Sequence, residues 1–269
     1  MRRFLAALLI ALAALASVQR AEAEDDSLAA IKARGKLIAG VKFDTPPFGF
    51  LDESNQPVGF DIDLVREIGK HLGVPVELVA VTSPTRIPML VSGNVDLVAA
   101  SMTRTPEREQ AIDFSITYYT GGQSLLVPSS SKITGVQDLA GKPVAVQQGT
   151  TLEKNLAAAA PKAEIVAFKD YNSAWLALRQ GRVDALTGSL NILQGFAKDN
   201  PRLQDRGITL QRRALRHRHA QGRHITARGG QPHTARSLDL RRLHGALSQM
   251  VRQRSDDADR DGAEVTSIG

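Results

Sequence analysis

The chain has 269 residues and a formal net charge of +6, with 34 basic and 28 acidic side chains. The excess is confined to the C-terminal part: from Gln211 onward there are 12 arginines and 6 acidic residues, so residues 1–210 carry 22 of each sign. A neutral body argues against nucleic acid as a partner. The absence of cysteine excludes disulfides, thiolate catalysis and cysteine-ligated zinc, and we expect neither a metal nor a cofactor.

Residues 1–23 are predicted to be a cleaved secretory signal peptide. Arg2 and Arg3 precede an apolar stretch over residues 4–16, and Ala21–Ala23 offers an A-x-A cleavage site. The apolar stretch is too short for a comfortable transmembrane span, and no other run is long enough. The signal region has no cysteine that could carry a lipid anchor, so we expect a periplasmic protein.

From Leu37 to about Leu210, short apolar strands alternate with amphipathic helices, which is typical of an α/β fold. Strands are predicted at residues 37–41, 76–81, 95–100, 125–128, 143–146, 164–168 and 183–186, and helices at 61–72, 86–91, 152–160, 173–180 and 191–198. The pattern restarts after the glycine pair Gly121-Gly122. This indicates two lobes, residues 24–122 and 123–210, with a hinge near residues 120–126.

The segment between Ser101 and Arg108 carries the clearest chemistry. It follows a predicted strand and opens a helix, for which Thr105 is a suitable N-cap and Pro106 a suitable first residue. Arg108 then lies in the first turn, beside unpaired backbone N–H groups, and Ser101 and Thr103 add hydroxyls. An arginine fork at a helix N-terminus suits a small carboxylate, although an exposed helix with a solvated arginine is the alternative.

Three parts of the chain together resemble the extracytoplasmic amino-acid-binding proteins of ABC importers, solute-binding protein family 3. They are Gly59–Leu64 before a helix, residues 82–88 together with 101–108, and residues 144–151. The resemblance covers about residues 28–210. It implies a two-lobed periplasmic-binding-protein type II fold that captures a polar or acidic amino acid. The protein would be a monomer that delivers this ligand to an ABC permease in the inner membrane.

By the same resemblance, Arg108 should pair with the α-carboxylate of the ligand. Thr103 and backbone N–H groups near Thr150 would assist it, and Ser101 would take part in binding the α-ammonium group.

Three further residues are expected at the ligand. Ser83 and Arg86 stand where members that bind acidic amino acids hold the side-chain carboxylate. Phe48 could pack on the ligand, or it could be an ordinary core or rim aromatic. Asp61 and Asp63 could suggest a carboxylate pair, but capping and structural hydrogen bonding is the favoured interpretation.

One position departs from the family. An aspartate that pairs with the ligand ammonium is usual after the strand equivalent to residues 183–186, whereas Ser189 stands there in this chain. Loss of a charged partner removes roughly 1.5–3 kcal/mol of binding. A ligand without a free ammonium therefore becomes conceivable.

The tail, residues 211–269, also departs from the family. It is rich in Arg and His and keeps no clear apolar period, so we expect it to be disordered. The family should instead return here to the first lobe. When the codons are read one nucleotide later, Ala214 to Arg223 can encode Pro-Tyr-Gly-Ile-Gly-Met-Pro-Lys-Gly-Asp, and Met250 before Val251 must read Trp. The interpretation is a frameshifted family C-terminus, an aberrant tail in place of the return segment.

Two alternatives to a transport receptor remain open. A cyclohexadienyl dehydratase-like enzyme could use the same scaffold, but it needs a general acid in the cleft, which Gly188 and Ser189 do not supply. The chain could also be a non-functional frameshifted product. Nucleic-acid binding by the basic tail lacks interleaved aromatics and a recognisable fold.

Overall fold

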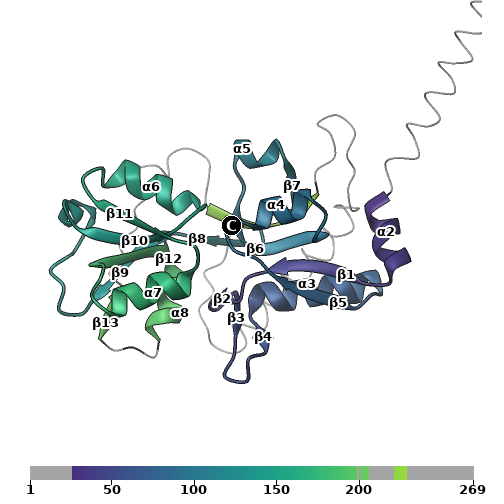
Figure 1. The fold of residues 1–269 in the computed structure, drawn as a ribbon, viewed down its shortest axis with the longest axis horizontal. Helices are drawn as coiled ribbons and strands as arrows, with labels where there is room; N and C mark the ends of the chain where they lie inside the picture. The colour runs from purple at the N-terminus through teal and green to yellow at the C-terminus, as the bar shows by residue number, and fades with distance from the viewer. Residues whose placement is uncertain (1–25, 199, 201, 206–220, 229–269) are drawn as a thin grey trace, which may run out of the picture.

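The computed structural model describes residues 26–198, 200, 202–205 and 221–228, and these form two lobes (Figure 1). The predicted signal peptide, residues 1–23, and most of the predicted tail lie outside the described residues. Among the helices described, none is long and apolar enough to cross a membrane.

The first lobe is built on a sheet with strand order β5-β1-β6-β14-β7, and β8 pairs with β14 at one end. The strand bounds are β1 Leu37–Val41, β5 Val76–Ala80, β6 Leu97–Thr103, β7 Ile112–Phe114, β8 Tyr119–Gly121 and β14 Gln221–Arg228. The helices are α2 Asp26–Arg34, α3 Phe60–Leu72, α4 Arg86–Val91 and α5 Pro106–Glu109. A small antiparallel sheet follows β1, formed by β2 Asp44–Thr45, β3 Gly49–Leu51 and β4 Pro57–Val58.

Helix α3 illustrates how the sequence fixes these elements. Its apolar residues recur at helical spacing and are buried against the sheet: Ile62, Leu64, Val65 and Ile68. Gly73 ends the helix in the left-handed conformation, with φ 73°, as the sequence predicts.

The second lobe has a sheet with strand order β11-β10-β12-β9-β13, in which β10 is parallel to β11 and β12. Its strands are β9 Gln123–Pro128, β10 Pro143–Gln147, β11 Glu164–Phe168, β12 Ala185–Ser189 and β13 Leu203–Asp205. Its helices are η2 Val136–Leu139 (a 3₁₀ turn), α6 Thr151–Ala159, α7 Tyr171–Arg179 and α8 Leu190–Ala197. The elements predicted from periodicity are all present, with ends that differ by a few residues.

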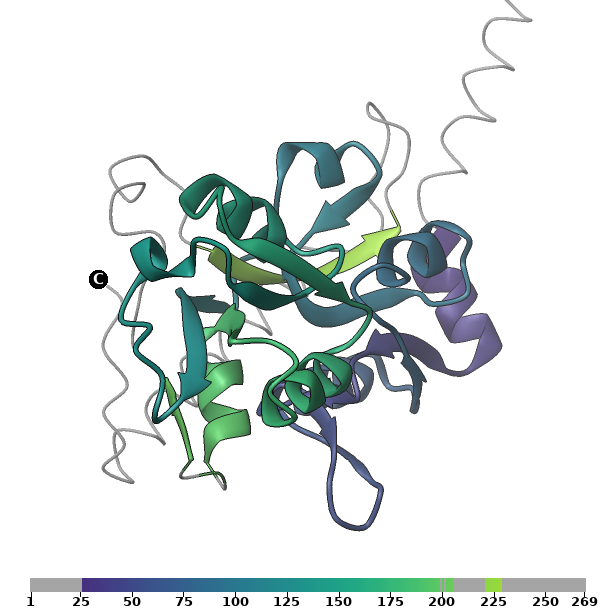
Figure 2. The same cartoon turned by 60° about the vertical axis from the view of Figure 1, so that its left-hand side comes forward.

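The chain passes from the first lobe to the second between β8 and β9, with only Gly122 between the two strands. Strand β14 lies alongside this crossing: Gln221 to Arg223 pair with Tyr119 to Gly121 of β8. Figure 2 shows β14 in yellow-green, running along the first-lobe sheet.

Strand β14 differs from the expectation that the tail from residue 211 is disordered. Seven of its eight residues pair antiparallel with β6, β7 or β8, with a register shift at Ile225, and Ile225 and Thr226 are buried. A strand inside a sheet is held mainly by main-chain hydrogen bonds, which any residue except proline can supply, so a polar sequence can fill the place. The frameshift interpretation of the remaining tail stays a prediction.

Candidate functional site

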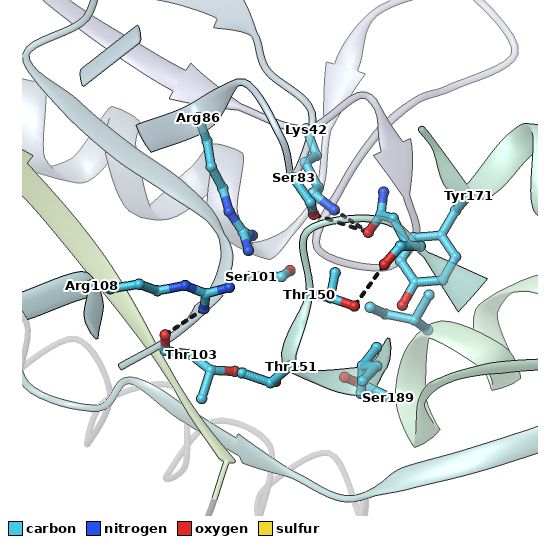
Figure 3. A pocket seen from close by; sticks show the side chains of 13 residues that line it. Lys42, Ser83, Arg86, Ser101, Thr103, Arg108, Thr150, Thr151, Tyr171 and Ser189 are labelled. Carbon is cyan, nitrogen blue, oxygen red and sulfur yellow. Dashed lines mark hydrogen bonds between the residues drawn. The ribbon is translucent and has the colours of Figure 1, made fainter. Parts of the chain in front are cut away.

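A pocket lies between the two lobes, at the carboxyl ends of their strands. It encloses about 350 Å³ of empty space, part of it open to solvent. The first lobe contributes side chains from the ends of β1 and β6 and from α4 and α5, and the second from the ends of β10 and β12 and the starts of α6, α7 and α8 (Figure 3). The lining residues are Lys42, Ser83, Arg86, Ser101, Thr103, Arg108, Gln147, Thr150, Thr151, Leu152, Tyr171, Ser189 and Ile192.

Arg108 spans the two lobes. Thr105 caps helix α5 by accepting a hydrogen bond from the Arg108 backbone N–H, with Pro106 at the first position, as the sequence predicts. The guanidinium donates from Nη1 to the Thr103 carbonyl, at 2.7 Å, and from Nη2 to the Gly149 carbonyl of the second lobe, at 3.0 Å. Burial lowers the pKa of Arg108 from its ordinary value, against the opposing effect of Glu107, and the group keeps its charge at neutral pH.

Ser101 is held in an unusual backbone conformation at the pocket. Its φ is 52°, in the left-handed region that a non-glycine residue seldom occupies. Asp61 supports it, because its Oδ2 accepts a hydrogen bond from the Ser101 backbone N–H at 3.2 Å, while Oδ1 accepts from the Tyr118 hydroxyl at 2.9 Å. The structural interpretation of Asp61 is therefore confirmed. Strain of this kind is concentrated at binding sites.

The deep side of the pocket holds two buried cations, Lys42 and Arg86, each 2% exposed. Arg86 donates from Nη1 to the Ala100 carbonyl at 2.6 Å. Lys42 donates from Nζ to Oε1 of Gln147 in the second lobe at 2.6 Å, and the Ser83 hydroxyl donates to the same oxygen at 3.1 Å. These contacts join the two lobes through one buried amide.

The second lobe presents mainly hydroxyl groups. Thr150 donates from Oγ1 to the Gln147 carbonyl at 2.7 Å, at the turn before α6, and Thr151 is the first residue of that helix. Ser189 ends β12 and stands at the N-cap of α8, where its side chain makes no capping hydrogen bond. Figure 3 shows Thr150 and Ser189 on the opposite side of the pocket from Arg108.

The structure brings together every residue that the sequence placed at the ligand except Phe48. Ser83, Arg86, Ser101, Thr103, Arg108, Thr150 and Ser189 all line the pocket. Phe48 does not. It is 2% exposed and packs edge-on against Tyr119 and Phe60, with ring centroids 4.9 and 6.3 Å away. The Phe48 ring packs in a hydrophobic core, which is the alternative that the sequence left open, and a contact of Phe48 with the ligand stays a prediction.

Sequence reasoning missed several lining residues, of which Lys42, Gln147 and Tyr171 matter most. A signal existed for two of them, because Lys42 directly follows the first predicted strand and Gln147 directly follows a predicted strand of the second lobe, residues 143–146. Ligands of open α/β sheets bind outside the carboxyl ends of the strands. Tyr171 begins a helix and gave no comparable signal. Among the described residues, no cluster of three His, Cys, Asp or Glu side chains could hold a metal ion.

Residues 37–206 match the profile of the bacterial extracellular solute-binding proteins, family 3. The chain belongs to this family. Members act outside the cytoplasm, in the periplasm or extracellularly, as receptors of ABC importers. One relative is the ABC transporter glutamine-binding protein GlnH of Bacillus subtilis, which is 42% identical over 188 residues, covering 68% of this chain and 69% of GlnH.

Solved structures agree with this assignment and with the type II periplasmic-binding-protein fold. A glycine-to-alanine mutant of arginine-bound ArgBP from T. maritima superposes with a TM-score of 0.73 at 31% identity, over 83% of this chain and 99% of ArgBP. An ancestral amino-acid-binding protein, described as a precursor of cyclohexadienyl dehydratase, gives a TM-score of 0.70 at 33% identity, over 88% and 95% of the two chains. Its relatives therefore identify this family 3 member as an amino-acid-binding protein. The same fold also occurs in a precursor of an enzyme.

Proposed function

We propose that this family 3 member captures an acidic or polar amino acid in the periplasm, with glutamate and aspartate as the first candidates. As a monomer, it presents the ligand to an ABC permease of the inner membrane, without a nucleic-acid partner or a cofactor. The observation that carries the proposal is the Arg108 fork, which lies in the cleft and is bonded to both lobes.

The arrangement can bind a carboxylate without further adjustment. A guanidinium carries five N–H donors, and two bonds to carbonyl oxygens leave donors that can point to a carboxylate. Thr103, Thr150 and Thr151 line the same pocket and add hydroxyl groups to it. A ligand held here touches both lobes, so its binding favours the closed arrangement that a permease can recognise.

Capture is favoured over catalysis on chemical grounds. A dehydratase needs a general acid that reaches the leaving group. Among the described lining residues none is Asp, Glu or His. The similarity to a dehydratase precursor keeps the enzyme as the second candidate. Recovery of the bound solute unchanged after prolonged incubation, followed by NMR, would distinguish the two.

Calorimetry of the purified chain against a panel of amino acids tests the proposed function. We expect glutamate or aspartate to bind, and Arg108→Ala to abolish that binding. The matched control is Arg104→Ala, because Arg104 is on the same segment but exposed and ion-paired with Glu109. Absence of binding by every amino acid, or full affinity in Arg108→Ala, would contradict the proposal.

A further inference from the structure

A buried glutamine lies close to the second-lobe residues that line the pocket. Gln123 is the first residue of β9 and follows Gly122, the single residue between β8 and β9 where the chain crosses from one lobe to the other. Gln123 is fully buried, and it is not among the residues that line the pocket. Any effect of Gln123 on a bound solute must therefore act through the residues that its side chain contacts.

The Gln123 amide makes three hydrogen bonds. Its Nε2 donates to the Leu152 carbonyl and to the Thr187 hydroxyl, both at 2.9 Å, and its Oε1 accepts from Nδ2 of Asn155 at 3.0 Å. The Thr187 hydroxyl in turn donates to the Ser124 carbonyl at 2.9 Å. Because the Leu152 carbonyl can only accept, the amide nitrogen must face it, and the amide oxygen must face Asn155. The network therefore fits one orientation of the Gln123 amide.

Two of these partners belong to helix α6, whose start lines the pocket. Leu152 is the second residue of α6, and it lines the pocket together with Thr150 and Thr151. Asn155 lies about one turn further along the same helix. Gln123 therefore holds the beginning of α6 at two points.

The third partner belongs to strand β12, which brings Ser189 to the pocket. Thr187 precedes Ser189 by two residues on β12, so the two side chains project from the same face of the strand. Ser189 is also the register partner of Gln123 between β12 and β9. Directly opposed residues of an antiparallel pair have Cβ atoms about 4.5–5.5 Å apart. One buried amide therefore connects both second-lobe elements, α6 and β12, that carry hydroxyl groups into the pocket.

We propose that Gln123 is a positioning residue of the solute site, which sets the start of α6 against the end of β12 so that Thr151 and Ser189 reach the same bound solute. This deepens the proposed function and rests on it in one respect, namely that a small solute is held between the lobes. A buried polar network whose members are all hydrogen-bonded is rigid, and residues that contact a ligand need such support to keep their geometry.

Replacing the amide by an apolar side chain of similar length tests the proposal. Gln123→Met keeps an unbranched side chain but cannot donate a hydrogen bond to the Leu152 carbonyl. Calorimetry uses glutamate, or the amino acid of the panel that the parent chain binds most tightly. We expect the dissociation constant to rise about tenfold or more, as for the loss of one hydrogen bond to a charged group.

Leu178→Val is the matched control for a general loss of stability. Leu178 is buried in the second lobe, at the opposite end of α7 from the pocket residue Tyr171. Its truncation should lower the thermal unfolding temperature. Because the site is distant, the dissociation constant should change by no more than about twofold.

NMR at saturating amino acid gives a reading that a merely structural role would not move. In the parent chain, binding should shift the backbone amide resonances of both lobes, including those of Thr103 in the first and of Thr151 and Ser189 in the second. In Gln123→Met the shifts of Thr151 and Ser189 should shrink, while that of Thr103 is retained. The Leu178→Val control should keep all three.

Hydrogen exchange tests the network without any solute. In Gln123→Met the amides of α6 should exchange about tenfold or more faster relative to those of α7, because the start of α6 has lost its support. Asn155→Ala removes only the donor to Oε1 and should act in the same direction but more weakly. It serves as the second variant if Gln123→Met does not fold.

The outcomes separate this inference from the proposed function. Unchanged affinity in both Gln123→Met and Asn155→Ala, or an equal loss of the first-lobe and second-lobe shifts, would overturn the inference and leave amino-acid capture standing. If no amino acid binds the parent chain, amino-acid capture is overturned and hydrogen exchange decides the inference. Unchanged exchange of α6 in Gln123→Met would then overturn the inference as well, and faster exchange would support it.

Discussion

Gln147 links the lobes through a single side chain, which makes it the residue whose replacement is most informative. Its Oε1 accepts hydrogen bonds from both Lys42 and Ser83, and all three side chains are buried. Removing the acceptor of a buried charged donor lowers the free energy of unfolding strongly, whereas removing both partners lowers it much less.

We predict that Gln147→Leu lowers the free energy of unfolding by about 1–3 kcal/mol, because Lys42 loses a buried acceptor. The double variant Lys42→Met/Gln147→Leu should recover part of this loss. Urea denaturation measures both. Gln148→Leu is the control, because Gln148 is the exposed neighbour, and an equal loss in that variant would contradict the prediction.

At the residue scale, the sequence predicted the positions of the polar residues of the site better than that of the apolar residue Phe48. Ser101, Thr103 and Arg108 could be found because a strand end, a cap residue and a helix start fix their positions locally. Phe48 could not be placed, since an aromatic side chain next to a cleft serves the core and a ligand equally well until packing is known. Lys42 was missed because its partner, Gln147, is 105 residues away in the sequence.

Among the elements, helix α3 depends on a glycine at its start. Gly59 has φ 121°, and a Cβ there would stand 2.5 Å from the Phe48 carbonyl oxygen. Both the backbone conformation and the space therefore demand glycine.

We predict that Gly59→Ala destabilises the protein clearly more than Gly73→Ala does. Gly73 also has a positive φ, but a Cβ there would meet nothing within 4 Å, so its replacement should cost only the roughly 1–2 kcal/mol of a left-handed residue. Chemical denaturation of the two variants gives the comparison. Equal losses of stability in the two variants would mean that the backbone moves away from the Phe48 carbonyl without a measurable loss of free energy.

The turn that leads into η2 depends on one carboxylate. The backbone N–H and hydroxyl of Thr134 and the backbone N–H of Gly135 all donate to Oδ2 of Asp138. Hydrogen bonds from the Thr134 backbone and hydroxyl hold the pKa of Asp138 below its usual 3.8. Since the folded-state pKa is lowered, the stabilisation is present above the unfolded pKa and is lost as pH falls through the folded one.

We therefore predict that Asp138→Asn is less stable than the parent chain near pH 6 and that the difference narrows below about pH 4. Denaturation curves at pH 6 and at pH 3 provide the test. If the difference in free energy of unfolding between the parent chain and Asp138→Asn is the same at both pH values, the carboxylate charge is not what stabilises the turn.

At the scale of elements, periodicity predicted the longer helices and strands between residues 37 and 198, because their apolar residues face the core of one lobe or the other. It did not predict the short elements β2, β3, β4, β7, β8 and η2. Strand β14 could not be predicted in this way. Its sequence is polar and lies in a segment without period, and its position is set by main-chain pairing with β6 and β7. The apolar periodicity of a short segment cannot show that a distant part of the chain leaves a place between two strands for it to fill.

At the scale of the whole molecule, β14 completes the first-lobe sheet, because it lies between β6 and β7. Ile225 is 6% exposed and belongs to the core formed by β1 and α3. Its backbone N–H donates to the Ser115 hydroxyl at 2.9 Å, and its carbonyl accepts from the Ser115 N–H at 2.8 Å.

We predict that Ile225→Ala lowers the free energy of unfolding by about 2–5 kcal/mol, the usual range for truncation in a core. The Ile225 amide should also exchange slowly with deuterium. Leu176→Ala is the control, because Leu176 is 50% exposed and should change stability by only about 0.5 kcal/mol. Rapid exchange and an unaffected Ile225→Ala variant would instead support a disordered tail.

The placement of β14 has a consequence for the order in which the protein can form during synthesis. The described strands of the second lobe lie within one stretch, residues 123–205, whereas the first lobe needs Thr226 opposite Val98, 128 residues earlier. A ribosome adds roughly 5–20 residues per second, and units fold as their sequence emerges. The lobe that is made first therefore waits for β14 until the described part of the second lobe has been synthesised. During that interval β6 and β7 present open edges to any chaperone or export factor bound nearby.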